Sequence, residues 1–299
     1  SEDDELQMDT EQDNAEEVTE IEEQSGSSDE ADTLDLDAGD AAVAGEKGTT
    51  SEFEYWHNGK EASITKYIGS SKSVSVPSSI GGYTVTSIGG SAFENTGITY
   101  VSIPNTVNAI ESYAFAGCSG LYSLTIPNSV TRLGVEIIRG TSVSSITVPK
   151  SVTECGASWG GAFDGAASLR YVSFENGIKK IPDHVCYARY YDSAISSVSI
   201  PASVTEIGVS AFEKCKSLKG IQLPAGLTEI KASAFRESGL VSINIPKTII
   251  NIGESSFKGC ASLQSVTMNY NDSIIESSTE GAYRYKCTIW YNAFEEDTS

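Results

Sequence analysis

A segment of 22 to 27 residues recurs along most of this sequence. Pro201–Leu223 reads PASVTEIGVSAFEKCKSLKGIQL, and the same frame returns at Pro104–Ile126 and at Pro246–Met268. With the proline position counted as the first, the repeats start at Pro77, Pro104, Pro127, Pro149, Glu175, Pro201, Pro224 and Pro246, and a ninth frame starts at Asn269. A repeat of this length buries its apolar side only by stacking on its neighbours, so the pattern predicts a solenoid.

Two apolar positions precede the proline position of each repeat, with one polar residue between them. The first column is Val101, Leu124, Ile146, Val172, Val198, Ile221, Ile243 and Val266. The second column is Ile103, Ile126, Val148, Phe174, Ile200, Leu223, Ile245 and Met268. A spacing of two is the side-chain period of a strand, so we expect the repeats to form a parallel sheet with these columns inward. Proline then ends each strand, because it has no N–H to give to a ladder.

The residues after the proline follow a V-x-x-I-G pattern and then an aromatic one. Ala-Phe or Ser-Phe pairs recur at Ala92-Phe93, Ala114-Phe115, Ala162-Phe163, Ala211-Phe212, Ala234-Phe235 and Ser256-Phe257. We expect the rings to stack in the interior. The glycines at 89, 134, 156, 208 and 253 suit a turn that bends tightly or takes a positive φ. Too few residues remain before the next strand for more than one turn of helix.

The combined pattern, L-x-x-(L/V)-x-I-P-x-x-V-x-x-I-G-x-x-A-F-x-x-C, resembles the BspA-type bacterial leucine-rich repeat family. The resemblance covers residues 77–268, about eight repeats. It implies a leucine-rich repeat solenoid that is right-handed and β-rich, has little regular helix, and has a parallel sheet on its concave face. It also implies a non-enzymatic protein, extracellular or on the cell surface, that needs no cofactor and binds or adheres to a protein or glycan on a host or neighbouring cell. Ile137-Ile138 depart from the pattern by replacing Ala-Phe, and the repeat from Glu175 lacks both the proline and the phenylalanine.

Charge divides the chain into an acidic segment and a nearly neutral one. Residues 1–52 contain 20 Asp and Glu and one Lys, a net charge of 1 − 20 = −19, whereas the remaining 21 acids and 19 bases of residues 53–299 give −2. We therefore expect an acidic disordered linker at 1–52, N-terminal cap strands at 53–76, repeats at 77–268 and a C-terminal cap at 269–299. A nearly neutral repeat region makes nucleic acid an unsuitable partner. No apolar run is long enough to span a membrane, although a lipid anchor upstream of Ser1 is compatible with the sequence.

Six cysteines raise the question of disulfides. Cys118, Cys215 and Cys260 each lie 14 residues after their proline. Equivalent positions two repeats apart lie about 10 Å apart, beyond the reach of a bridge, so we predict buried free thiols. Cys155 and Cys186 take core positions, which leaves the pairing of Cys287 open. Zinc held by Cys155, His184 and Cys186 is the alternative, but it lacks the fourth ligand of a structural site.

Two further motifs suggest chemistry without meeting its requirements. Asp35, Asp37, Asp40 and Glu46 approximate an EF-hand calcium loop, but Gly39 takes the fifth position and Asp40 the sixth, which reverses the required order. Residues 156–160 read G-x-S-x-G, the nucleophile elbow of serine hydrolases with Ser158 as nucleophile, which requires a preceding strand and a following helix. Gly156 is the ordinary glycine of its repeat. We favour a binding module and keep a hydrolase and a passive structural spacer as alternatives.

The outward side of the predicted sheet offers one candidate binding surface. Its middle column is neutral and rich in hydroxyls: Ser102, Thr125, Thr147, Ser173, Ser199, Gln222, Asn244 and Thr267. Tyr100, Tyr122, Arg170 and Tyr171 lie beside it and could stack on a glycan or an extended peptide. The alternative is that these short polar residues only solvate an exposed sheet.

Two adjacent long repeats offer a second candidate surface. Relative to the repeat from Pro201, the repeats from Pro149 and Glu175 each contain three extra residues, around Trp159 and within 187–192. Insertions in a solenoid go to loops on one face, often the binding face. Trp159, Tyr187, Arg189, Tyr190 and Tyr191 could form one aromatic patch with a cationic edge. The alternative is that the aromatic rings fold inward and fill the space of the missing phenylalanine.

Overall fold

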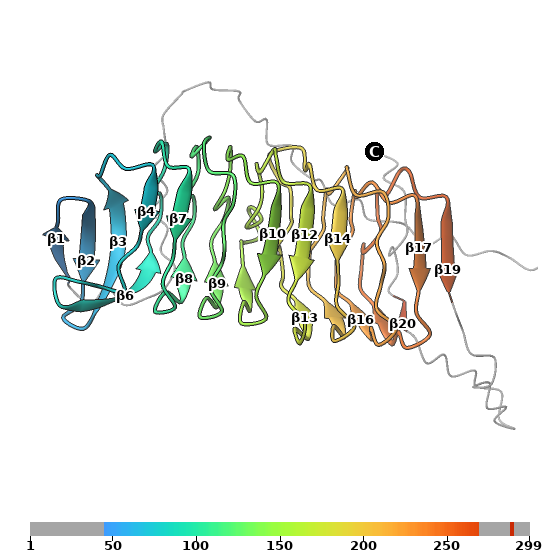
Figure 1. The fold of residues 1–299 in the computed structure, drawn as a ribbon. Coiled ribbons are helices and arrows are strands. Elements are labelled where there is room, and N and C mark those ends of the chain that lie inside the picture. Colours follow the sequence, from blue (N-terminus) through green and yellow to red (C-terminus); the bar gives the residue numbers. More distant parts are fainter. Residues whose placement is uncertain (1–44, 269–287, 290–299) are drawn as a thin grey trace, which may run out of the picture. The chain divides into compact units, whose positions relative to one another are not determined.

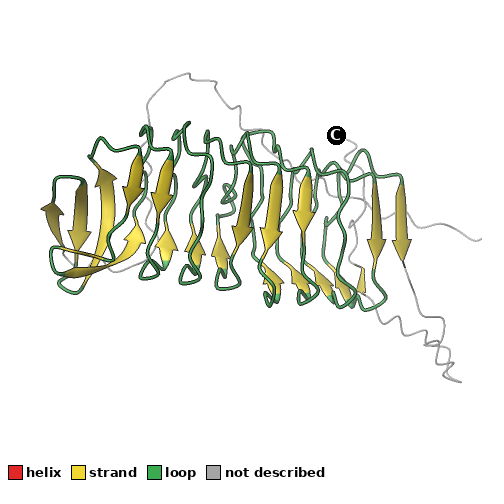
Figure 2. Cartoon of the chain, in the orientation of Figure 1, coloured by secondary structure: helices red, strands yellow, loops and turns green. Residues whose placement is uncertain are grey.

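The computed structural model describes residues 45–268 and 288–289, and these form a β-solenoid (Figure 1). The chain divides into two units, Ser1–Ala41 and Ala42–Ser299, and all the described residues lie in the second. Their regular elements are short strands joined by turns and loops (Figure 2). The predicted repeat solenoid with little helix is therefore confirmed. Within the described ranges no helix has the length and apolar character of a membrane span.

The strands that directly precede the proline positions follow one another along one face of the solenoid, and we call this set of parallel strands the proline ladder. Its strands are β4 (Ser73–Ser75), β7 (Tyr100–Ser102), β10 (Ser145–Val148), β12 (Tyr171–Phe174), β14 (Ser197–Ser199), β17 (Ser242–Ile245) and β19 (Ser265–Met268). Ile146 pairs with Val172, so the predicted first column is in register. Val266 is 37% exposed although it belongs to that column, because β19 is the last described strand of the ladder. The ladder consists of three sheets, β4-β7, β10-β12-β14 and β17-β19.

A second ladder, which the sequence did not predict, runs through the V-x-x-I-G segments, and we call it the isoleucine ladder. Its parallel strands are β6 (Tyr83–Ile88), β8 (Ala109–Ile110), β9 (Arg132–Leu133), β11 (Glu154–Cys155), β13 (Lys180–Ile181), β15 (Glu206–Ile207), β16 (Glu229–Ile230), β18 (Asn251–Ile252) and β20 (Thr288–Ile289). Most contain two residues, too few for an alternating pattern to be visible in the sequence. The ladder is divided between β11 and β13.

The N-terminal cap starts earlier than the sequence indicated. Strand β1 (Glu46–Thr49) pairs antiparallel with β2 (Phe53–His57), although the sequence analysis assigned residues 1–52 to the linker. Strand β2 pairs antiparallel with β3 (Glu61–Tyr67), β3 runs parallel to β6, and β5 (Ser79–Ile80) pairs antiparallel with β6. The boundary at residue 52 is therefore wrong, because backbone pairing with β2 orders a segment that has no apolar pattern of its own. The rest of the predicted linker and most of the predicted cap at 269–299 lie outside the described residues.

The predicted stack of aromatic rings is present at both ends of the repeat region and interrupted in the middle. Ring centroids lie 5.2 Å apart for Phe93 and Phe115 and 5.4 Å apart for Phe212 and Phe235. Between these pairs Ile138 and Cys186 take ring positions, and both are buried. Aliphatic and thiol groups therefore fill the interior at the two repeats that depart from the family pattern.

The repeated glycine serves close packing of successive turns rather than a positive φ. A Cβ on Gly134 would lie 2.2 Å from the backbone nitrogen of Ser112 in the preceding turn. Of the five predicted glycines only Gly156 has a positive φ, of 55°. The left-handed conformation falls two residues after the glycine position, at Ser91, Tyr113, Glu136, His184, Ser210, Ser233 and Ser255.

The described cysteines are buried free thiols, as predicted: Cys118, Cys155, Cys186, Cys215 and Cys260. Three of them also hydrogen-bond between turns. The Sγ of Cys118 donates to the carbonyl of Phe93 at 2.9 Å, and the Sγ of Cys260 donates to that of Phe235 at 3.0 Å. Each thiol thus satisfies a carbonyl at the ring position of the preceding turn. Cys287 lies outside the described residues.

Candidate functional site

The two insertions meet at the edge of the solenoid. Ala157 and Gly160 exchange backbone hydrogen bonds of 2.8 and 3.0 Å, which closes the first insertion into a tight turn. The next residue, Gly161, donates its N–H to the carbonyl of Tyr187 at 3.1 Å, and a Cβ at this glycine would lie 2.3 Å from that oxygen. Glycine therefore lets the second insertion pack directly on the first. We call the exposed face of residues 158–159 and 189–192 the inserted-loop surface.

A buried carboxylate holds the second insertion in place. Asp164 is 1% exposed, and its Oδ2 accepts hydrogen bonds from the backbone N–H groups of Arg189 at 3.0 Å and Tyr190 at 3.1 Å. Its Oδ1 is buried and has no hydrogen-bond partner among the described residues. Burial raises the pKa of the Asp164 carboxyl, and the backbone N–H groups that bind it oppose the rise. The buried carboxylate thus holds the backbone of the loop on its inner side, and the side chains of Tyr190 and Tyr191 are exposed on its outer side.

The structure divides the five predicted residues of this patch between surface and core. Tyr190 and Tyr191 are 59% and 47% exposed, and Trp159 is half-buried. Tyr187 is only 8% exposed, with its ring centroid 6.0 Å from that of His184. The prediction that Tyr187 contributes to the patch is therefore wrong. This ring follows the cysteine that replaces phenylalanine and is buried with the core.

Arg189 and the two exposed tyrosines form the aromatic part of the surface. The guanidinium carbon of Arg189 lies 5.2 Å from the centre of the Tyr190 ring, within cation–π range. Gly165, with a φ of 70°, makes room for Tyr191, because a Cβ there would lie 3.0 Å from the Cδ2 of that ring. The predicted combination of aromatic rings and a cation is thus present, with Tyr190, Tyr191 and Arg189 as its members.

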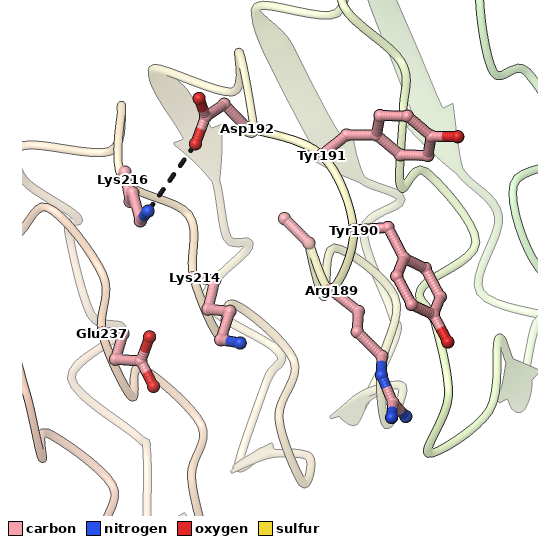
Figure 3. Close-up of a pocket in the computed structure, with 8 residues that line it drawn as sticks. Arg189, Tyr190, Tyr191, Asp192, Lys214, Lys216 and Glu237 are labelled. Carbon is pink, nitrogen blue, oxygen red and sulfur yellow. Dashed lines mark ion pairs between the residues drawn. The ribbon is translucent and has the colours of Figure 1, made fainter. Parts of the chain in front are cut away.

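A polar pocket of about 220 Å³ lies beside this loop. It is lined by Ala188, Arg189, Tyr190, Tyr191, Asp192, Lys214, Lys216 and Glu237 (Figure 3). Lys216 pairs with Asp192 at 3.6 Å, whereas Lys214 makes no side-chain ion pair or hydrogen bond with any described residue. In Figure 3 the tyrosine rings extend from the loop on the side away from Lys214 and Lys216. The site therefore has an aromatic side and a cationic side.

Sequence reasoning missed the two lysines. Both follow Phe212 in the next repeat, at positions that are normally solvated, and no local motif marks them. The signal that could have found them is the repeat register, since residues just after the ring position stack beside the insertion of the preceding repeat.

The residues predicted on the outward sheet face are exposed but do not form one cluster. Tyr122 is 61% exposed, and Tyr100, Arg170 and Tyr171 are exposed as well. Tyr100 lies in β7 and Tyr171 in β12, with β10 between them in chain order. Arg170 uses its Nη1 to donate to the carbonyl of Ala167 at 2.7 Å. No ring contact joins the three tyrosines in the described part of the chain.

The geometry around Ser158 differs from that of a nucleophile elbow. Ser158 is exposed in the tight turn, with a two-residue strand before it, no helix after it in the described residues, and its carbonyl bound to Arg189. His184 makes no hydrogen bond to the Ser158 hydroxyl. Its Nδ1 is buried without a partner among the described residues, and burial lowers the pKa of its imidazole.

Among the described residues no three His, Cys, Asp or Glu side chains converge as a metal site, so Cys155, His184 and Cys186 do not form the alternative zinc site. Asp35, Asp37 and Asp40 lie outside the described residues.

Comparisons with known proteins agree with the repeat pattern. Residues 86–189 and 184–289 match the family model described as BspA type Leucine rich repeat region, in six copies. No curated protein matches the chain. Similar solved structures include a leucine-rich repeat protein from Eubacterium ventriosum, 21% identical, with 74% of this chain and 71% of that chain covered and a TM-score of 0.39. A leucine rich cell surface protein from Faecalibacterium prausnitzii is 21% identical, with 76% and 96% covered and a TM-score of 0.31. The pneumococcal vaccine antigen PcpA is 17% identical, with 76% and 82% covered and a TM-score of 0.31.

Proposed function

Since the chain belongs to the BspA-type leucine-rich repeat family, we propose that it is a non-enzymatic binding or adhesion module that acts at the bacterial cell surface or outside the cell. Its partner in this proposal is a protein or glycan on a host or neighbouring cell. The inserted-loop surface is the ligand site that we infer.

One observation carries this inference: hydrogen bonds on the inner side of the inserted loop fix its backbone, while its aromatic side chains are exposed. Asp164 and Gly161 fix the backbone of the loop through hydrogen bonds of 3.0 to 3.1 Å. Tyr190 and Tyr191 remain exposed on that fixed backbone. A site that is ordered before binding loses less conformational entropy on association, and Tyr and Arg are the residue types that dominate binding energy.

The charges at the site indicate the class of ligand. Among the described residues Lys214 makes no ion pair, and Lys216 pairs only with the exposed Asp192. Arg189 keeps guanidinium hydrogens available beyond the one bound by Ser158. The ligand that we propose therefore presents a flat apolar face to Tyr190 and a carboxylate or another anion to Lys214. Acidic sugars and acidic peptide segments both have this chemistry.

An array that contains sialylated, uronate-containing and neutral glycans together with acidic and neutral peptides tests this function. We expect binding to acidic members only, with at least about tenfold weaker binding for Tyr190→Ala and for Lys214→Ala, the loss that corresponds to about 1.4 kcal/mol. Tyr122→Ala is the matched control, because Tyr122 is equally exposed but lies away from the insertions. If both inserted-loop variants bind like the wild-type protein, the site is wrong.

The spacer and hydrolase alternatives predict different results. A structural spacer binds no member of the array at any accessible concentration. A hydrolase releases product from an ester or amide substrate, and Ser158→Ala abolishes that release.

A further inference from the structure

The aromatic side of the inserted-loop surface lies against Arg139, which belongs to the repeat from Pro127, two repeats earlier in the chain. A Cβ on Gly165 would lie 2.7 Å from the Cγ of Arg139 and 3.0 Å from the Cδ2 of Tyr191, so the arginine stem and the tyrosine ring pack over the same glycine. Burial acts to lower the pKa of the Arg139 guanidinium, but Glu136 and the Tyr191 phenol outweigh it, and the pKa is raised. Tyr191 is therefore next to a cation outside the two insertions.

Arg139 also contacts an aromatic ring of the repeat before its own. Its guanidinium carbon lies 5.3 Å from the centre of the Tyr113 ring, within cation–π range. Burial raises the pKa of the Tyr113 phenol, and Glu136 raises it further. The phenols of Tyr190 and Tyr191 are close enough to add to this rise in pKa. The three phenols therefore lie near one another, although they come from repeats that are three apart.

Ion pairs neutralise the charges around Tyr113. The Nη1 of Arg139 donates to the Oε2 of Glu136 at 3.0 Å, and its Nη2 lies 3.4 Å from the Oε1 of Glu94. Glu136 is only 3% exposed, whereas Glu94 is half-buried. Two carboxylates around one guanidinium do not attract an anion. The surface is therefore aromatic without a free cation at this end and cationic at the end formed by Lys214.

The backbone beneath these rings has no open strand edge. Gly117 N–H donates to the Arg139 carbonyl at 2.7 Å, and Gly140 N–H donates to the Gly165 carbonyl at 3.1 Å, so successive turns are bonded to each other. Extended peptides are commonly bound through an unpaired edge, which is missing among these bonded turns. A sugar ring needs a flat aromatic face and hydroxyl partners instead. The exposed phenols supply both.

We propose that the inserted-loop surface continues over Arg139 to Tyr113 and that its ligand is a linear acidic oligosaccharide lying along the solenoid axis. Sugar rings stack on Tyr190 and Tyr113, and a carboxylate of the sugar pairs with Lys214. The turns that carry Tyr113 and Tyr190 are three repeats apart, about 14 Å along the axis at the spacing of paired strands, so the ligand contains several sugar rings. This inference rests on the function proposed above and adds to it the class and length of the ligand and the contact with Tyr113.

Two size series of linear uronate glycans test the class and the length of the ligand. Oligogalacturonides and hyaluronan oligosaccharides of increasing length are titrated into the whole chain, and calorimetry measures each affinity. We expect the affinity in at least one series to rise at least about tenfold from the shortest member to one that reaches from Lys214 to Tyr113. Equal affinities at all lengths, or no binding in either series, overturn the proposal. An acidic peptide of matched charge that binds as tightly as the longest glycan overturns the glycan as ligand.

Tyr113→Ser removes the far contact and suits the local backbone. Tyr113 has a φ of 61°, and serine takes the equivalent position with a φ of 55° at Ser91 and 50° at Ser210. We expect the longest binder to lose about threefold to tenfold in affinity, while the shortest is unchanged. Tyr113→Phe is the matched control, because it keeps the ring that stacks. If Tyr113→Ser fails to fold, the length series decides, because it uses the wild-type protein.

The same measurements separate this inference from the proposed function. If Tyr190→Ala and Lys214→Ala weaken binding but Tyr113→Ser and ligand length have no effect, the inserted-loop surface is the site and its extension is wrong. If none of the three variants weakens binding, the proposed site itself is wrong. Arg139 is left unchanged in these variants, because its removal would leave the buried Glu136 without its ion pair.

Discussion

The Nη1 of Arg189 donates a hydrogen bond of 3.0 Å to the carbonyl oxygen of Ser158, and this bond joins the insertion of one repeat to that of the next. Neither insertion contains a strand longer than the isolated Ala157–Gly160 bridge. The two loops therefore depend on each other and on Asp164 for their conformation. Substitutions at these contacts should change ligand binding without removing any exposed ring.

Replacement of Asp164 should release the inserted loop. In Asp164→Ala the partly buried hydrogen bonds from the N–H groups of Arg189 and Tyr190 lose their acceptor, and we expect a loss of about 1 to 3 kcal/mol in the free energy of unfolding. Asp164→Asn keeps one acceptor oxygen and should lose less. Urea denaturation measures the free energy, and amide hydrogen exchange at residues 189 and 190 reports the loop itself. Equal exchange rates in Asp164→Ala and wild type would contradict the role given to this carboxylate.

The same carboxyl should make stability depend on pH in an unusual direction. Burial raises the folded-state pKa of Asp164 above its ordinary value of 3.8, so the folded protein binds this proton more tightly than the unfolded chain does. The stability gained from protonation is complete below the unfolded pKa and is lost as the pH rises through the folded pKa. The wild-type protein should therefore gain stability relative to Asp164→Asn, which has no proton to bind there, as the pH falls from about 7 to about 4. Denaturation of both proteins at the two pH values checks the sign, and a relative loss contradicts it.

The described thiols should be inert in the folded protein. Burial raises the pKa of Cys215 to about 12 and that of Cys186 well above its usual range, so neither forms the reactive thiolate at neutral pH. In a Cys287→Ser variant, which limits the readout to the five described cysteines, we expect alkylation only at the rate of unfolding. Mass spectrometry with and without urea measures this. Rapid labelling of the native variant would show that a thiol is accessible.

The glycine of the V-x-x-I-G segment should tolerate no side chain. Gly134→Ala places a methyl group 2.2 Å from the Ser112 nitrogen, a backbone atom that cannot move aside without shifting the preceding turn. Overpacking of this kind costs about 1 to 3 kcal/mol or more. Gly97→Ala is the control, because a Cβ there meets nothing within 4 Å. Comparable thermal melting of the two variants would show that turn spacing does not require the glycine.

The sequence was sufficient for the features that repeat in every turn. Residues such as Ile146 and Val172 could be aligned because each returns at a fixed offset from a proline, and their register in the proline ladder follows from that alignment. Strands of two residues, such as Glu206–Ile207, gave no visible period, so the isoleucine ladder was missed. The reason for the repeated glycine also depends on the distance between turns, which no single repeat contains.

The candidate site was predictable in place but not in detail. Repeat lengths located both insertions, because extra residues in a solenoid leave the register and enter loops. Whether Tyr187 or Tyr190 faces inward depends on which side chain fits the space beside Cys186, and a sequence does not specify that space. The exposed lysines depended on stacking between repeats, which the residues of a single repeat do not reveal.

The interruptions of the two ladders never coincide along the solenoid. Where residues 121–127 interrupt the proline ladder, β8 and β9 remain paired on the isoleucine ladder, and where β11 and β13 are unpaired, β10 and β12 remain paired. The proline ladder is interrupted a second time, between β14 and β17, and there the strands β15 and β16 of the isoleucine ladder remain paired. A pulling force along the solenoid axis therefore always meets a backbone ladder on at least one face. Tension along the axis thus cannot separate two described turns unless a ladder of backbone hydrogen bonds breaks, which is the mechanical property that the proposed adhesion module requires.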